Sequence, residues 1–133
     1  MPAMLSSRTL SVSINCSPDK AYEFLANPEN WPQWAKGLGQ SLKKHNGSWI
    51  VETPQGQVEI RFTALNKFGI TDHYVKTPTG TEVYVPMRVV ANGSGSEVIF
   101  TLFRLPEMTE EIYDRDQKLV EQDLGSLKDI LEK

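Results

Sequence analysis

The stretch SVSINCSPDKAYEFLANPENWPQW, residues 11–34, decides the fold of this chain of 133 residues. It begins inside a run in which apolar and polar side chains alternate, which is the pattern of a strand with one buried face. The apolar members of the run are Leu10, Val12 and Ile14. We therefore predict a strand over residues 8–15 that turns this face toward a core.

Two short helices are predicted after that strand. Ser17 can cap the first helix, and Pro18 suits its first position, where the amide hydrogen that proline lacks would have no partner. This helix should end just before Pro28, because a proline disfavours helical geometry in the preceding residue. A second helical piece over residues 28–38 then carries two tryptophans three residues apart on one side. They are Trp31 and Trp34, which could either roof a ligand entrance or plug the end of a sheet.

Residues 40–104 are predicted to form six further strands joined as hairpins. Glycine together with asparagine, proline or serine marks each turn, because these residues adopt the backbone angles that reverse a chain. The five turns are HNG at 45–47, PQG at 54–56, NKFG at 66–69, PTG at 78–80 and NGSG at 92–95.

The clearest strand alternation follows the PTG turn, and it predicts which side chains face the core. They are Val83, Val85, Met87 and Val89. Pro86 lies among their outward neighbours and cannot donate the hydrogen bond that a central strand needs, so we expect an edge or a bulge there.

Helical periodicity replaces alternation after Pro106 and continues to the end of the chain. The apolar side of this long helix carries Ile112, Leu119, Val120, Leu124, Leu127, Ile130 and Leu131. Asp116 and Asp123 fall near the centre of the same side, about 10 Å apart along the axis. An isolated carboxylate in a dry core is costly, so each needs a partner, water or a raised pKa. They either pair with strand arginines such as Arg104 or reach water, or they line a partly solvated pocket as ligand anchors or acid-base groups.

The strand TDHYVK, residues 71–76, holds three groups that can donate hydrogen bonds or move protons. Alternation allows either His73 to face inward, or Asp72 together with Tyr74. Pairing from the NKFG turn favours His73, whereas pairing from the PTG turn favours the other two, so both alternatives stay open here.

Composition argues against several classes of function. Apolar residues at 39% and charged residues at 23% are ordinary for a globular domain. A net charge of -3 with scattered Lys and Arg offers no basic surface for nucleic acid.

No signal peptide and no apolar run of about 18 residues is found, so we expect a cytoplasmic protein without membrane insertion. Cys16 is the only cysteine and is expected to be inert. His45 and His73 lie far apart, so we expect no metal and no cofactor.

With these residues the chain resembles the START-like superfamily, also called SRPBCC or helix-grip proteins. The resemblance spans nearly the whole chain and rests on residues 11–34, on VPMRVVANGSGSEVIFTLFR at 85–104 and on EEIYDRDQKLVEQDLGSLKDILE at 110–132. Within this superfamily, the chain is most similar to small bacterial members grouped with polyketide cyclases and dehydrases. The resemblance implies one α+β domain over residues 1–133, in which a curved seven-stranded antiparallel sheet (β-α-α-β6-α) wraps around the long C-terminal helix.

That resemblance also implies an apolar cavity between the sheet and the C-terminal helix. The favoured prediction is binding of a small hydrophobic or aromatic molecule that is lipid-, polyketide- or quinone-like. One alternative is a cyclase or dehydratase that uses a cavity acid or His73 as its base. Another is a protein-interaction module whose sheet edge or last helix docks a partner or a second copy, which would form a homodimer. The candidate ligand-binding residues are Trp34, Phe62, His73, Tyr74, Arg104, Asp116, Val120 and Asp123.

Overall fold

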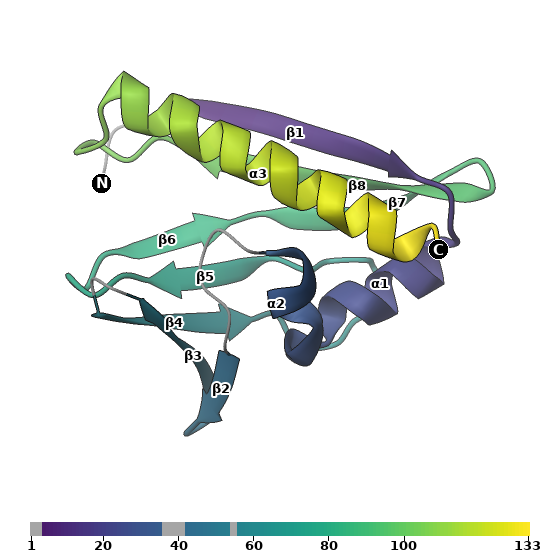
Figure 1. Ribbon diagram of the computed structural model, residues 1–133, viewed down its shortest axis with the longest axis horizontal. Coiled ribbons are helices and arrows are strands. Elements are labelled where there is room, and N and C mark those ends of the chain that lie inside the picture. Colours follow the sequence, from purple (N-terminus) through teal and green to yellow (C-terminus); the bar gives the residue numbers. More distant parts are fainter. Residues whose placement is uncertain (1–3, 36–41, 54–55) are drawn as a thin grey trace.

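A long helix lies across two antiparallel sheets in the computed structural model, which describes residues 4–35, 42–53 and 56–133 (Figure 1). One sheet has the order β1 (Ser7–Ile14), β8 (Gly95–Phe103) and β7 (Met87–Asn92). The other has the order β2 (Leu42–His45), β3 (Ser48–Thr53), β4 (Gly56–Phe62), β5 (His73–Lys76) and β6 (Glu82–Val85). The long helix is α3 (Glu110–Leu131). This arrangement confirms the predicted helix-grip fold.

The first sheet joins segments from opposite ends of the chain. β1 pairs with β8 in an antiparallel register that runs from Ser7 opposite Phe103 to Ile14 opposite Ser96. Figure 1 shows β1 beside β8, with α3 crossing in front of them. Alternation puts Val12 and Ile14 on the face that packs toward the helix, where Ile14 is buried in the core.

The short helices form where the sequence predicts them. Helix α1 (Pro18–Ala26) begins after Ser17, whose side chain accepts a hydrogen bond from the Lys20 amide at 3.2 Å. The next turn, η1 (Pro28–Asn30), leads directly into α2 (Trp31–Trp34). The predicted end of this second piece at residues 36–38, and the first two residues of the predicted turn at 54–56, lie outside the described residues.

The predicted hairpin at residues 45–47 is confirmed by its backbone angles. Asn46 and Gly47 both have positive φ, at 49° and 82°. This is the type I′ geometry whose twist matches that of the flanking strands. It places His45 opposite Ser48 and so sets the register of β2 against β3.

The strand count differs from the prediction because Pro86 divides one expected strand into β6 and β7. The described residues therefore form eight strands instead of seven. Proline has no amide hydrogen to continue the ladder. After the break, β6 remains paired with β5, whereas β7 pairs with β8. The Pro86 carbonyl still accepts a hydrogen bond from the Thr101 amide at 3.0 Å.

Asp72 holds the two sides of this break together. Its carboxylate accepts hydrogen bonds from the Met87 amide at 2.8 Å, from the Tyr84 hydroxyl at 2.8 Å and from two guanidinium nitrogens of Arg88 at 2.9 Å each. Burial alone would raise the pKa of Asp72, but the bonds from Arg88, Met87 and Tyr84 outweigh that effect and lower it to about 2. The carboxylate is therefore ionised and fully engaged at neutral pH.

We predict that Asp72→Asn lowers the free energy of unfolding by about 2–3 kcal/mol, because it removes the charge that Arg88 and the Met87 amide stabilise. Urea denaturation followed by circular dichroism measures the loss. Glu82→Gln is the matched control on the neighbouring strand, since Glu82 pairs with Arg61 at 2.9 Å with its side chain 45% exposed. That substitution should cost less than about 1 kcal/mol. Equal losses in the two variants would contradict the role given to Asp72.

Candidate functional site

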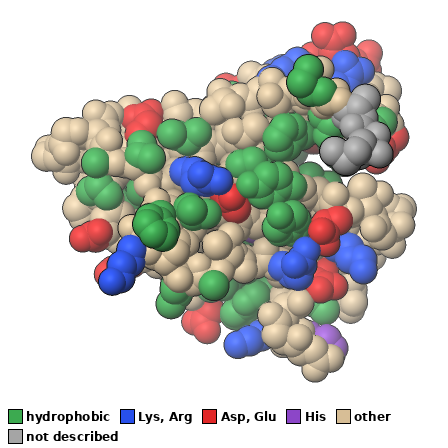
Figure 2. Space-filling model, turned by 180° about the vertical axis from the view of Figure 1, so that it is seen from behind, with side chains coloured by type: hydrophobic (Ala, Val, Ile, Leu, Met, Phe, Trp, Pro, Cys, Tyr) green, Lys and Arg blue, Asp and Glu red, His purple; other side chains and the backbone are tan. Residues whose placement is uncertain are grey.

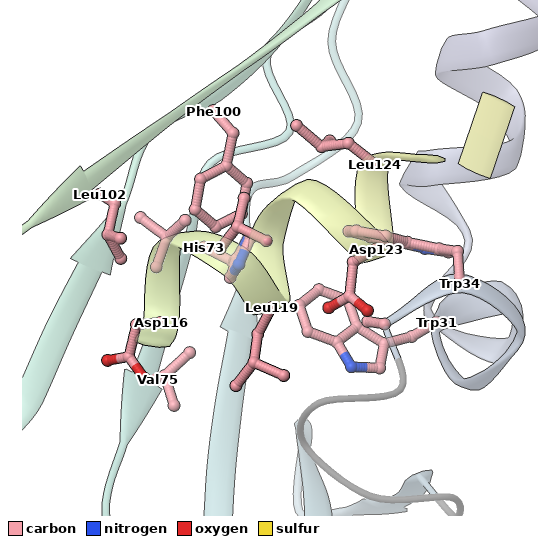
Figure 3. A pocket seen from close by; sticks show the side chains of 13 residues that line it. Trp31, Trp34, His73, Val75, Phe100, Leu102, Asp116, Leu119, Asp123 and Leu124 are labelled. Atoms are coloured by element: carbon pink, nitrogen blue, oxygen red, sulfur yellow. The ribbon is translucent and has the colours of Figure 1, made fainter. Parts of the chain in front are cut away.

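A mostly apolar cavity of about 230 Å³ lies between α3, α2 and the two sheets (Figure 3). The helices contribute Trp31, Trp34, Asp116, Leu119, Val120, Asp123 and Leu124 to its lining, together with Ala35. The strands contribute His73, Val75, Val85, Phe100 and Leu102. An apolar hollow with a few polar groups is the usual form of a small-molecule site.

The N-terminal end of α3 is fixed by Tyr113. Its side chain is 2% exposed, its hydroxyl donates a hydrogen bond to the Leu102 carbonyl at 2.9 Å, and the Arg8 guanidinium lies 4.1 Å from its ring centroid. Ile112, which was predicted to face the core, is instead 37% exposed. That prediction was wrong because successive helix residues are about 100° apart, and the larger side chain with a polar tip takes the buried position.

The C-terminal end of α3 is fixed by leucines and by polar contacts to β1. Leu124, Leu127 and Leu131 are all buried. The Lys128 ammonium donates a hydrogen bond to the Ser13 carbonyl at 2.7 Å, and the Asn15 amide donates to the Glu132 carboxylate at 2.8 Å. The middle of the helix lies between these two anchors, and there its inner residues border the cavity instead of a packed core.

His73 is the polar group at the floor of the cavity. The register that pairs His73 with Phe62 of β4 and Val85 of β6 turns it inward, so the first of the two open alternatives is correct. Its side chain is 2% exposed. The Nδ1 atom lies 3.2 Å from the Thr71 carbonyl oxygen, which can only accept, so Nδ1 carries the hydrogen and Nε2 of the neutral ring is an acceptor.

Burial keeps the His73 ring neutral. Desolvation lowers its pKa to about 4, against smaller opposing effects from the Thr71 carbonyl and from Asp72. Aromatic rings surround it, with ring centroids of Trp31 at 4.9 Å and Phe100 at 6.4 Å. His73 is therefore a fixed hydrogen-bond acceptor at neutral pH and a weak base.

Asp116 and Asp123 are the two carboxylates of α3 that border the cavity (Figure 3). Burial raises the pKa of Asp116 above its ordinary value, more than the nearby Arg115 lowers it. Among the residues that the structure describes, no hydrogen bond or salt bridge partner is found for Asp116. The pair with Arg104 that the sequence allowed does not form, because the guanidinium Nε of Arg104 instead donates to the Met108 carbonyl at 3.2 Å.

Two further candidates from the sequence, Trp34 and Val120, also line the cavity. Trp34 is buried, and its ring centroid lies 5.1 Å from that of Trp31. The two tryptophans thus form one wall. The indole Nε1 of Trp31 is buried without a hydrogen-bond partner among the described residues. Strand alternation on β5 and β8 could also have indicated Val75, Phe100 and Leu102, which were missed as lining residues.

The structure places the other candidates away from the cavity lining. Phe62 packs behind it, with its ring centroid 5.4 Å from that of Trp31 and 6.0 Å from that of His73. Arg104 belongs to the connection between β8 and α3. Tyr74 points to the opposite face of the sheet, because it follows the inward His73 in a strand, and it stacks there on Tyr84 at 5.1 Å.

That opposite face carries stacked aromatic rings among charged side chains. Tyr84 also lies 6.4 Å from Phe103, and the Arg61 guanidinium lies 4.8 Å from the Tyr74 ring. From behind, Figure 2 shows apolar side chains interspersed with Lys, Arg, Asp and Glu. Within the described parts of the chain, no three residues of metal-binding types gather at one point, and no helix is long and apolar enough to cross a membrane.

We predict that the burial of His73 makes the fold less stable in acid. The unfolded chain binds a proton at this site below its ordinary pKa of 6.5, whereas the folded chain does so only below about 4. Stability should therefore fall as the pH drops through this window, by about 3 kcal/mol in total. Asp72 adds its own loss only below its ordinary pKa of 3.8, and the raised pKa of Asp116 acts in the opposite direction.

The difference between wild type and His73→Gln isolates this effect. Urea unfolding near pH 7 and near pH 4.5 should show a loss of stability in wild type that is about 2 kcal/mol larger than in the variant. His45→Gln, at an exposed position on β2, should keep the wild-type profile. The same pH dependence in all three proteins would contradict the burial of a neutral His73.

The family of the chain follows from comparison with known proteins. A family model described as "Polyketide cyclase / dehydrase and lipid transport" matches residues 7–132. The chain belongs to this family. The resemblance seen in the sequence is therefore confirmed over the same strands and helices that build the cavity. No curated protein matches the chain.

Solved structures support the same fold for this polyketide cyclase/dehydrase and lipid-transport family member. The protein XoxI from Bacillus cereus has 17% identity and a TM-score of 0.75, with 95% of each chain covered. The Aha1 dimer from Colwellia psychrerythraea has 20% identity and a TM-score of 0.71, with 96% of each chain covered. DynU16, a protein in the dynemicin biosynthetic locus, has 17% identity and a TM-score of 0.73 over 96% of this chain and 47% of its own.

These likenesses at low identity show the fold alone. The homodimer, the cytoplasmic location, and the absence of a cofactor, metal or nucleic acid stay predictions from the sequence.

Proposed function

We propose that this protein binds a small hydrophobic or aromatic molecule in the cavity between α3 and the sheets. The observation that carries the proposal is a hollow of about 230 Å³ with a mostly apolar lining. A cavity of about 150 Å³ lined by apolar side chains is large enough for benzene. The volume found here therefore suits a ligand of one or two rings, which the membership in a family of cyclases, dehydrases and lipid transporters also supports.

The lining suggests how such a ligand would be held. The rings of Trp31, Trp34 and Phe100 offer wide apolar surfaces that lose little side-chain entropy, and burial against them supplies most of the affinity. His73 and Asp116 supply the few polar contacts that would fix the orientation of the ligand. Leu119, which is 38% exposed beside them, marks the side from which a ligand would enter.

Binding without turnover is favoured over the cyclase or dehydratase alternative by the state of His73. A base whose pKa is about 4 removes a proton poorly at neutral pH. No other titratable group among the described residues forms a hydrogen bond with its ring. The observation that favours catalysis is Asp116, whose raised pKa and place at the cavity would suit an acid or a base.

The interaction-module alternative has less support, because it requires a cavity filled by core side chains. The stacked rings of Tyr74, Tyr84 and Phe103 on the opposite face would then be the surface for a partner protein. Tyr74 and Tyr84 are each only 37% exposed. Their contacts with each other and with Arg61 already cover part of that apolar area.

Native mass spectrometry of the purified protein, followed by organic extraction, tests the proposal without a choice of ligand. A molecule released in stoichiometric amount should be apolar or aromatic and of one or two rings. Protein isolated without any ligand would shift support to turnover of an absent substrate or to a partner protein.

We predict that filling the cavity weakens ligand binding without unfolding the protein. Val120→Phe adds a ring to the cavity wall, so binding of naphthalene, followed by amide chemical shifts in ¹⁵N-labelled protein, should weaken at least about tenfold. Val90→Phe is the matched control, at a valine on β7 that is 42% exposed and outside this lining. Equal naphthalene affinity in both variants would contradict the proposed site.

A further inference from the structure

The polar groups of the cavity have a common hydrogen-bonding character. His73 donates through Nδ1 to the Thr71 carbonyl at 3.2 Å, so the nitrogen left for a ligand is Nε2, which accepts. The ring is 2% exposed and lies edge-on to the Trp31 ring at an interplanar angle of 88°, which fixes its orientation. The buried histidine therefore offers an acceptor to a ligand and no donor.

Asp116 adds a second acceptor about a third of the way along α3. It lines the cavity and has no hydrogen bond or salt bridge to another described residue, so its carboxylate oxygens are available to a ligand. An ionised carboxylate can only accept hydrogen bonds. Asp123 lines the same cavity further along the helix. A ligand in the cavity therefore meets one acceptor from the sheet, at His73, and another from the helix, at Asp116.

The described lining residues include no lysine and no arginine. A bound carboxylate or sulfonate would thus lose its hydration among apolar side chains and would lie near the charge of Asp116. Arg8, Arg88 and Arg104 do not compensate, because their guanidinium groups are engaged elsewhere with Asp114, Asp72 and the Met108 carbonyl. Arg115 is near Asp116 but is exposed and does not line the cavity. An uncharged ligand avoids both costs.

A hydroxyl group meets the requirements of this lining better than an uncharged group that can only accept hydrogen bonds. It can donate a hydrogen bond to His73 Nε2 or to the Asp116 carboxylate, the two acceptors of the lining. An ether or a ketone can only accept, and it would leave the acceptors of the cavity unsatisfied, which lowers affinity.

We infer that the cavity selects uncharged aromatic molecules that carry a hydroxyl group, and that it rejects aromatic carboxylates. This inference rests on the proposed function, since it assigns the chemical class of the ligand that the cavity binds. It follows from the acceptors His73 and Asp116, from the apolar walls around them and from the lack of a described cation in the lining.

Four probes of one shape test the inference: naphthalene, 2-naphthol, 2-methoxynaphthalene and 2-naphthoate. Their dissociation constants for the wild-type protein can be measured near pH 7 by amide chemical-shift titration. We expect 2-naphthol to bind at least about tenfold more tightly than 2-naphthoate and severalfold more tightly than 2-methoxynaphthalene. Perturbed signals should come from residues beside the cavity.

Asp116→Asn tests the assignment to a residue. Removing the negative charge should narrow the ratio between the affinities for 2-naphthol and 2-naphthoate by severalfold. Asp129→Asn is the matched control, because it makes the same change at an exposed position of the same helix that does not line the cavity. It should leave the ratio at the wild-type value.

The outcomes separate this inference from the proposed function. If naphthalene binds in the cavity but 2-naphthoate or 2-methoxynaphthalene binds as tightly as 2-naphthol, the cavity is a binding site and the inferred ligand class is wrong. An unchanged ratio in Asp116→Asn overturns the part assigned to that carboxylate. If none of the four probes binds, the proposed function is overturned and the inference falls with it.

Discussion

The attachment of α3 at both of its ends is the constraint on which the cavity depends. Tyr113 fixes the first turns through its hydrogen bond to Leu102 and the cation above its ring, while Leu124, Leu127 and Leu131 fix the last turns. A hydrogen-bonded helix of 22 residues curves only gently, so its middle does not close the gap in the packing beneath it. Val85 and Met87, on either side of Pro86, both belong to the core, and Val85 also borders the hollow.

Two neighbouring residues where β5 begins serve different purposes in this fold. Asp72 faces outward and is satisfied by four hydrogen bonds that join β5 to the broken strand, so its charge is structural. His73 faces inward among aromatic rings, is kept neutral by burial, and presents an acceptor to the cavity. Asp116 approaches that cavity from the helix and carries the raised pKa of a partly buried carboxylate. The polar groups of the hollow thus come from two elements that are far apart in the sequence.

The order of elements, the Ser17 cap of α1 and the inward side of α3 with Asp116 and Asp123 could all be predicted from local patterns. The orientation of residues 72–74 could not, because a change of one residue in the pairing of β4 with β5 exchanges the two faces. The same limit applies to Tyr74, which lies on the outer face. The burial of Tyr113 in place of its neighbour Ile112 depends instead on tertiary contacts of Tyr113 with Leu102 and Arg8, which helical periodicity does not reveal. The sequence predicts an edge or a bulge at Pro86, but it does not show that Asp72, 15 residues before Met87, accepts the hydrogen bond of the Met87 amide after the break.

The central claim is that α3 and the sheets enclose an apolar hollow that a small molecule can occupy. A crystal structure determined under xenon pressure tests it most directly, because xenon enters apolar cavities and scatters strongly. We expect xenon between Trp31, Phe100 and Leu124, with these side chains in place and the fold unchanged. A crystal structure in which side chains such as Trp34 and Leu119 fill that space, with no xenon bound there, would contradict the claim.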